Sequence, residues 1–166
     1  MLTSRAGTRP RPWAAKAAIS AAALLPILGA AMLRAPGAAA DPAPGLEQAV
    51  LAARGGASCG ALQHNATVEH AAEIVNRSNY AYLNHSGENV PIDEPHPTAI
   101  AKDLGIQGTK VLSLLGAGQV EAEAVKGVLL QGYNAIPDCS YTSFGASQLY
   151  EEQSGLVLVA VLLVGS

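Results

Sequence analysis

The sequence predicts an α+β fold in which helices come first and a β-hairpin closes the domain. Apolar residues recur at helical spacing in several segments between residues 45 and 133, whereas strand-forming residues dominate from Tyr141 onward. The first forty residues have a different character and resemble a targeting signal, so they are not expected to belong to the fold.

Residues 1–40 are predicted to be a secretory signal peptide of bacterial type. A basic start is followed by an apolar run from Ala17 to Leu33, and a small-residue segment ends before Asp41. Because this is the order of a cleavable signal, we expect cleavage after Ala40. The alternative is an uncleaved membrane anchor, which an apolar run of this length could also support.

The mature chain, residues 41–166, has the length of a single domain. It keeps five of the ten Lys and Arg residues and all thirteen Asp and Glu residues, which gives it a net charge of −8. Phosphate binding needs clustered Lys and Arg, so nucleic acid is an unsuitable partner, and anionic membrane surfaces are disfavoured for the same reason. We expect a secreted protein, located outside the cell or in its envelope.

The two cysteines, Cys59 and Cys139, are predicted to form a disulfide. Export places an even pair of cysteines in an oxidising compartment, and both lie beside loop-forming residues. One alternative is zinc ligation, although neither cysteine has a second ligand at finger-like spacing. The other alternative is a pair of buried free thiols.

Two helices are predicted in the first half of the mature domain. Residues 45–54 form a short amphipathic helix that the string "GGASCG" ends. A second helix begins after Asn65 or Thr67 as N-cap, and we expect it to fray through residues 76–85. The next stretch, residues 86–98, is dense in Gly, Pro and acidic residues and is predicted to be a loop.

The following segments are less uniform. Residues 98–105 predict a short helical turn that Gly105 ends, and the apolar string "VLSLLGAG" after it fits either a helix or a strand. Residues 119–133 place Val and Ala on one face, which predicts a third helix despite Gly127.

The C-terminal part is predicted to be a β-hairpin. The strings "YTSFGASQLY" and "LVLVAVLLV" have the composition of two strands, joined by the polar turn "EEQSG". The last run is apolar on both faces and therefore predicts a buried strand. Nine apolar residues are too few to cross a bilayer, so we expect no membrane span in the mature chain.

The strings "GYNAIPDCSYTSFGAS" and "CGALQHNATVEHAAEIV" resemble the CAP superfamily, which comprises the cysteine-rich secretory, antigen 5 and pathogenesis-related 1 proteins. In that family a helix ends in His-Arg-x-Asn-Ile, and an aromatic-Thr-x-x-Gly strand follows a short loop. Ile136, Tyr141, Thr142 and Gly145 fall at those spacings. The resemblance covers residues 45–166 and implies an α-β-α sandwich with a small antiparallel sheet.

The family's cleft contains two His and two Glu residues, a set that can hold a divalent metal. Carried over to this chain, the first His place is His85, and a Glu place is Thr109. The second His place falls at Gly132, or at its neighbour Tyr133. The resemblance therefore implies a cleft remnant that keeps one ligand type, and we expect no bound metal, no cofactor and no catalysis.

The string "YLNHSGENV" holds His85 and Glu88 and contains the Gly-Glu-Asn that the family uses. In the family a further helical segment separates the two pieces, so this Gly-Glu-Asn comes too early, and we interpret it as a coincidental loop. The main hypothesis is a secreted, non-catalytic binding or interaction module for an apolar envelope molecule or a protein partner. The alternatives are a metal-dependent hydrolase that uses His85 and Glu88, and a structural envelope protein without a ligand.

Overall fold

The structure is a computed structural model, and it describes residues 43–84 and 97–166. The predicted signal peptide and its cleavage site lie outside these residues. All described residues belong to one compact unit of the chain, residues 35–166. None of the helices in the described ranges is long and apolar enough to cross a membrane.

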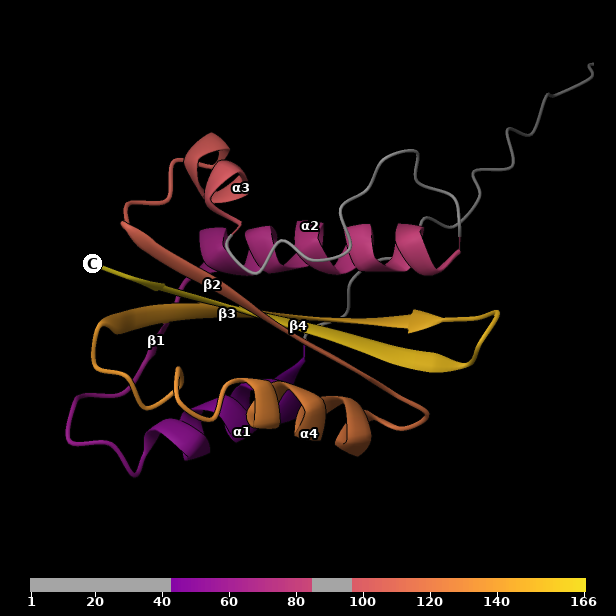
Figure 1. Ribbon diagram of the computed structural model, residues 1–166, viewed down its shortest axis with the longest axis horizontal. Coiled ribbons are helices and arrows are strands. Elements are labelled where there is room, and N and C mark those ends of the chain that lie inside the picture. Colours follow the sequence, from indigo (N-terminus) through magenta and orange to yellow (C-terminus); the bar gives the residue numbers. More distant parts are fainter. Residues whose placement is uncertain (1–42, 85–96) are drawn as a thin grey trace, which may run out of the picture. The chain divides into compact units, whose positions relative to one another are not determined.

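Helices cover both faces of a mixed β-sheet, which gives three layers (Figure 1). The α+β class and the C-terminal hairpin are confirmed. The described elements, in chain order, are α1 (Pro44–Arg54), β1 (Gln63–His64), α2 (Ala66–Leu83), α3 (Thr98–Asp103), β2 (Lys110–Gly118), α4 (Glu121–Gln131), β3 (Tyr141–Glu151) and β4 (Leu156–Gly165).

The strand order is β1-β3-β4-β2. The hairpin strands β3 and β4 are antiparallel, and β2 joins β4 in the antiparallel direction, so β4 is central and buried as predicted. The three long strands form the expected small antiparallel sheet, and the two-residue strand β1 makes it mixed because it pairs in parallel with β3. The hairpin turn ends at Gly155, whose φ of +70° suits glycine.

The second predicted helix is longer and more regular than expected. The side chain of Asn65 accepts hydrogen bonds from the N–H groups of Thr67 and Val68, as an N-cap does. The prediction of fraying from Asn76 onward is wrong, because α2 runs to Leu83. Tertiary contacts hold this half in place: the buried Asn76 side chain donates to backbone carbonyls of the two hairpin strands.

The core is divided by the sheet into two clusters of buried apolar side chains. One cluster fills the space between the sheet and the layer of α1 and α4. The other lies under α2 and α3. The largest members of the first cluster are Tyr141, Phe144, Ile136, Leu46, Leu62, Leu114 and Leu163. Those of the second are Leu162, Val68, Val75, Val111 and Val164.

Two glycines allow helices to lie directly on the sheet. A Cβ atom at Gly145 of β3 would overlap the backbone of Glu69 in α2. A Cβ atom at Gly116 of β2 would overlap the carbonyl group of Ala124 in α4. Each glycine therefore sets the distance between a helix and the strand beneath it.

Two loops at one end of the domain are joined by a covalent bond and by a buried arginine. Cys59 and Cys139 form the predicted disulfide, with their Cα atoms 5.5 Å apart. Beside it, the guanidinium of Arg54 donates hydrogen bonds to four backbone carbonyls. The acceptors are Gly60, Ile136, Asp138 and Tyr141.

Candidate functional site: an apolar groove between α2 and β2

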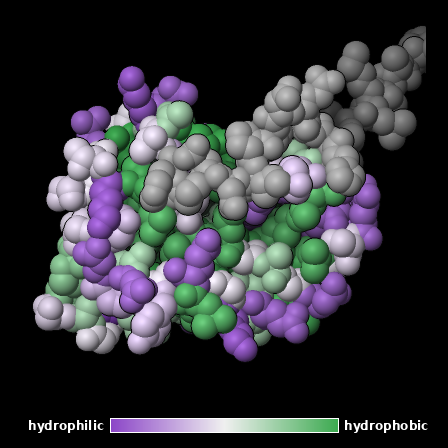
Figure 2. All heavy atoms as spheres, viewed as in Figure 1, coloured by the Kyte–Doolittle hydropathy of each residue, from purple (hydrophilic) through white to green (hydrophobic). Residues whose placement is uncertain are grey.

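An apolar pocket of about 290 Å³ lies between the C-terminal half of α2 and the edge strand β2. We call it the α2–β2 groove. Its lining residues are Asn79, Tyr82 and Leu83 of α2, Leu115, Gly116 and Ala117 of β2, and Leu158 of β4. Hydrophobic residues also gather across the middle of the face shown in Figure 2, between polar margins.

The groove follows from how the helices are distributed over the sheet. Helix α2 packs on β3 and β4, and the short helix α3 covers only the beginning of β2. The second half of β2 therefore lacks a helix above Leu115 and Ala117 among the described elements. Tyr82 and Leu83 border this space and are 38% and 44% exposed. Such partly exposed large apolar side chains beside a pocket are typical of a binding surface.

The groove lining favours apolar contact over bond-breaking chemistry. Its described residues carry two polar side chains, the carboxamide of Asn79 and the phenol of Tyr82. The described lining contains no Asp, Glu, His, Cys, Lys or Arg side chain. More generally, residues 43–84 and 97–166 contain no group of three His, Cys, Asp or Glu placed to hold a metal ion.

A cluster of polar side chains lies away from the groove, where β2 begins. The Lys110 ammonium donates to Asp138 at 2.7 Å and to the Ser140 hydroxyl at 2.6 Å. The hydrogen bond to Asp138 is the main cause that raises the pKa of Lys110, and the same bond lowers the pKa of Asp138 to about 2. Lys110 therefore stays protonated at neutral pH and cannot take a proton from Ser140, so a hydrolase with a Ser-Lys pair is not supported.

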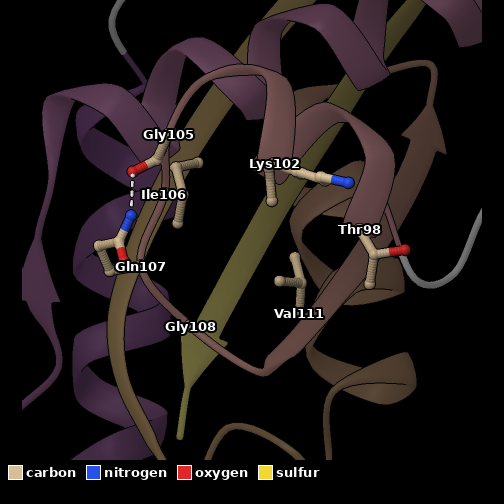
Figure 3. A pocket seen from close by; sticks show the side chains of 8 residues that line it. Thr98, Lys102, Gly105, Ile106, Gln107, Gly108 and Val111 are labelled. Carbon is tan, nitrogen blue, oxygen red and sulfur yellow. Dashed lines mark hydrogen bonds between the residues drawn. The ribbon is translucent and has the colours of Figure 1, made fainter.

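A second pocket, of about 270 Å³, lies under α3 (Figure 3). Its lining residues include Thr98 and Lys102 of α3, Ile106 from the segment after α3, and Val111 of β2. The Gln107 side chain turns back and donates to the Gly105 carbonyl oxygen at 3.1 Å. This pocket is more polar than the α2–β2 groove, and its one cationic side chain, Lys102, gives it a mixed character.

The predicted cleft residues fall in different places. His85 lies outside the described residues, as does Glu88, although Leu83 of the groove precedes His85 by two positions. Thr109 is exposed just before β2, and its N–H donates to the Gly165 carbonyl oxygen at 3.1 Å.

Gly132 and Tyr133 lie together at the end of α4, on the opposite face of the sheet from α2. With Ala53, Leu129, Ile136 and Pro137 they line a pocket of about 280 Å³, which we call the α1–α4 pocket. A Cβ atom at Gly132 would touch the Leu114 side chain. Leu114 lies five residues after Thr109 in the direction of β2, and five residues of extended strand span roughly 16 Å. The structure therefore does not bring Thr109 and Gly132 together.

The sequence interpretation missed the residues of β2 that form the groove floor. The string "VLSLLGAG" carried the signal, since an apolar segment that ends in small residues leaves space beside its neighbours. The groove floor could have been inferred from this string only if the segment had been recognised as a strand.

The comparisons with known proteins reveal a similarity of fold. No family model matches the sequence, and no curated protein matches it. Among solved structures, an outer surface protein from Borrelia burgdorferi is similar, with a TM-score of 0.58. The match covers 78% of this chain and 98% of that chain at 13% sequence identity. This likeness shows the fold alone.

Proposed function

We propose that the mature protein is a secreted, non-catalytic binding module of CAP-like type that holds an apolar molecule in the α2–β2 groove. The observation that carries the proposal is the groove itself. Its floor is formed by Leu115 and Leu158, and its edge by the partly exposed Tyr82 and Leu83. An apolar group that binds there removes this surface from water, and this burial stabilises the complex by about 25 cal/mol for each Å² of apolar surface.

The size of the groove limits the ligand. Pockets for drug-sized molecules are typically ~300–1,000 Å³ in volume. At about 290 Å³ the groove is at the lower end, which suits one acyl chain better than a fused-ring ligand. Asn79 and Tyr82 offer a carboxamide and a phenol to a polar head group at the groove edge.

The resemblance to the CAP superfamily agrees with this proposal in two structural respects. The matched aromatic-Thr-x-x-Gly string begins β3 at Tyr141, and its glycine, Gly145, lies where α2 packs on the sheet.

Export is the remaining part of the proposal. N-terminal sequencing of protein from the culture medium should find a chain that begins at or near Asp41, and recovery of Met1 would contradict export with cleavage.

The binding proposal is tested by filling the groove. Ala117 is exposed on the edge strand and lines the groove, so Ala117→Phe adds a side chain there with little effect on the core. Ala122→Phe on the exposed surface of α4 is the matched control. The wild-type protein and both variants are purified from native secretion, and organic extracts are analysed by mass spectrometry.

We expect the wild-type extract to contain apolar molecules. The amount extracted with Ala117→Phe should be about tenfold lower, which corresponds to a loss of about 1.4 kcal/mol of binding free energy. Ala122→Phe should retain them. Equal amounts in all three proteins would contradict the groove as the binding site. Their absence from all three would instead favour the structural envelope protein without a ligand.

A further inference from the structure

The disulfide and the Arg54 hydrogen bonds join the same two loops. The first loop follows α1 and contains Cys59 and Gly60, and the second precedes β3 and contains Cys139. Arg54 is 2% exposed and reaches carbonyls on both sides of this junction. One connection is covalent and can be reduced, whereas the other consists of hydrogen bonds that a reductant does not affect.

The disulfide is open to reagents. Cys139 is exposed and Cys59 is partly exposed, in contrast to the buried guanidinium beside them. Accessibility is one of the properties that distinguishes reducible disulfides from inert structural ones.

The second of these loops also lines the α1–α4 pocket, beside the end of α1. Ile136 and Pro137 line that pocket from the second loop, and Ala53 lines it from the end of α1. The Cys59 sulfur lies 3.7 Å from the Pro137 carbonyl oxygen, so the disulfide is next to this wall.

We infer that Cys59–Cys139 is a reversible redox clasp, which stiffens the α1–α4 pocket when it is closed and loosens it when an external dithiol opens it. Arg54 keeps the domain folded in the open state. It also keeps the two loops next to each other, so that Cys59 and Cys139 can form the same disulfide again on oxidation.

The chemical step is thiol–disulfide exchange. A thiolate of the dithiol attacks the exposed Cys139 sulfur, the Cys59–Cys139 bond breaks, and Cys59 leaves as a thiolate. The second thiol of the reagent then attacks the mixed disulfide and releases Cys139. Two electrons and two protons pass to the protein, and the reagent leaves as its own disulfide.

The test uses the exported protein with dithiothreitol as the dithiol, under native conditions. Alkylation and mass measurement give the redox state. Hydrogen exchange followed by mass spectrometry compares the loop amides with those of β4. Suitable reporters are the N–H groups of Ala57, Asp138 and Tyr141, which are bonded to backbone carbonyls within the loops.

We expect complete reduction, exchange about tenfold faster in the two loops, and unchanged exchange in β4. The Cys59→Ser/Cys139→Ser double variant should show the same pattern without a reductant. After removal of dithiothreitol the wild type should recover the disulfide and the slow exchange. Arg54→Lys should reform it more slowly, because its loops are no longer held in register.

Three results would overturn the inference. A disulfide that resists dithiothreitol in the folded protein would show that it is not accessible. Faster exchange throughout β4 would show that it is a structural crosslink. Unchanged loop exchange after reduction would show that it controls nothing in the loops.

Discussion

The guanidinium of Arg54 donates a 2.8 Å hydrogen bond to the carbonyl oxygen of Tyr141, which lies 87 residues later in the chain. A second buried bond, also of 2.8 Å, reaches the carbonyl oxygen of Ile136. One side chain therefore joins the end of α1 to the beginning of β3.

We predict that Arg54→Met lowers the free energy of unfolding by about 2 to 5 kcal/mol, since it leaves two buried carbonyl oxygens without donors. Methionine keeps the apolar stem but removes the donors. Arg77→Met on the exposed side of α2 is the control and should change the value by less than about 0.5 kcal/mol. Urea unfolding measures both, and equal effects would contradict the importance of the Arg54 network.

Gly145→Ala should destabilise the protein by about 3 kcal/mol or more, because its methyl group has no room against the backbone of Glu69. Helix α2 would have to move away from the sheet. Gly56→Ala is the matched control, since a Cβ atom there meets nothing within 4 Å. Thermal unfolding of the two variants checks the prediction, and a wild-type melting temperature for Gly145→Ala would contradict the close packing.

The fold was largely predictable because its strongest signals are local. Asn65 as N-cap, the helical spacing in α2 and α4, and the apolar run of β4 each appear within a short window of sequence. Local patterns could not predict β1, since two residues paired with β3 carry no periodicity. They also left the state of β2 open, because an apolar segment with two glycines fits both a helix and a strand.

The groove and the Arg54 network depend on non-local contacts and could not be predicted in the same way. Arg54 ends an alanine-rich helix and carries no motif, yet its acceptors lie up to 87 residues away. The groove exists because α2 lies over β3 and β4 and leaves the second half of β2 without a described helix on that face of the sheet, whereas α4 packs on the opposite face. The disulfide was predictable because the chain has two cysteines and a segment that predicts export.

Acid should weaken the link between β2 and the loop before β3. The Lys110 hydrogen bond, followed by the Ser140 N–H, lowers the pKa of Asp138 from 3.8 to about 2. A carboxylate with a lowered pKa contributes stability above its ordinary pKa, and this contribution is lost as the pH falls through the lowered value.

The melting temperature of Asp138→Asn should therefore be below that of the wild type above about pH 4, and the difference should disappear near pH 2. When Lys110→Met is present in both proteins, the difference between their melting temperatures should depend less on pH, because the main cause of the lowered pKa of Asp138 is removed. A difference that is constant with pH would contradict the role of the Lys110–Asp138 bond.

The alternative metal-dependent hydrolase is tested by calorimetric titration of the exported protein with zinc. The cleft interpretation keeps one imidazole, His85, and a stable zinc site needs three or four protein ligands. We predict no stoichiometric binding, and His85→Ala should change the free energy of unfolding by less than about 1 kcal/mol. Micromolar zinc binding that disappears in His85→Ala or Glu88→Ala would contradict this prediction and favour the hydrolase hypothesis.

The central claim is that an apolar molecule binds between α2 and β2, and methyl NMR tests it most directly. The probe is decan-1-ol, a neutral chain that the negative charge predicted for residues 41–166 does not repel. We predict saturable shifts of the Leu83, Leu115 and Leu158 methyl signals, and their loss in Ala117→Phe. Shifts at Leu129 and Ile136 of the α1–α4 pocket instead, or no saturable shifts, would contradict the claim.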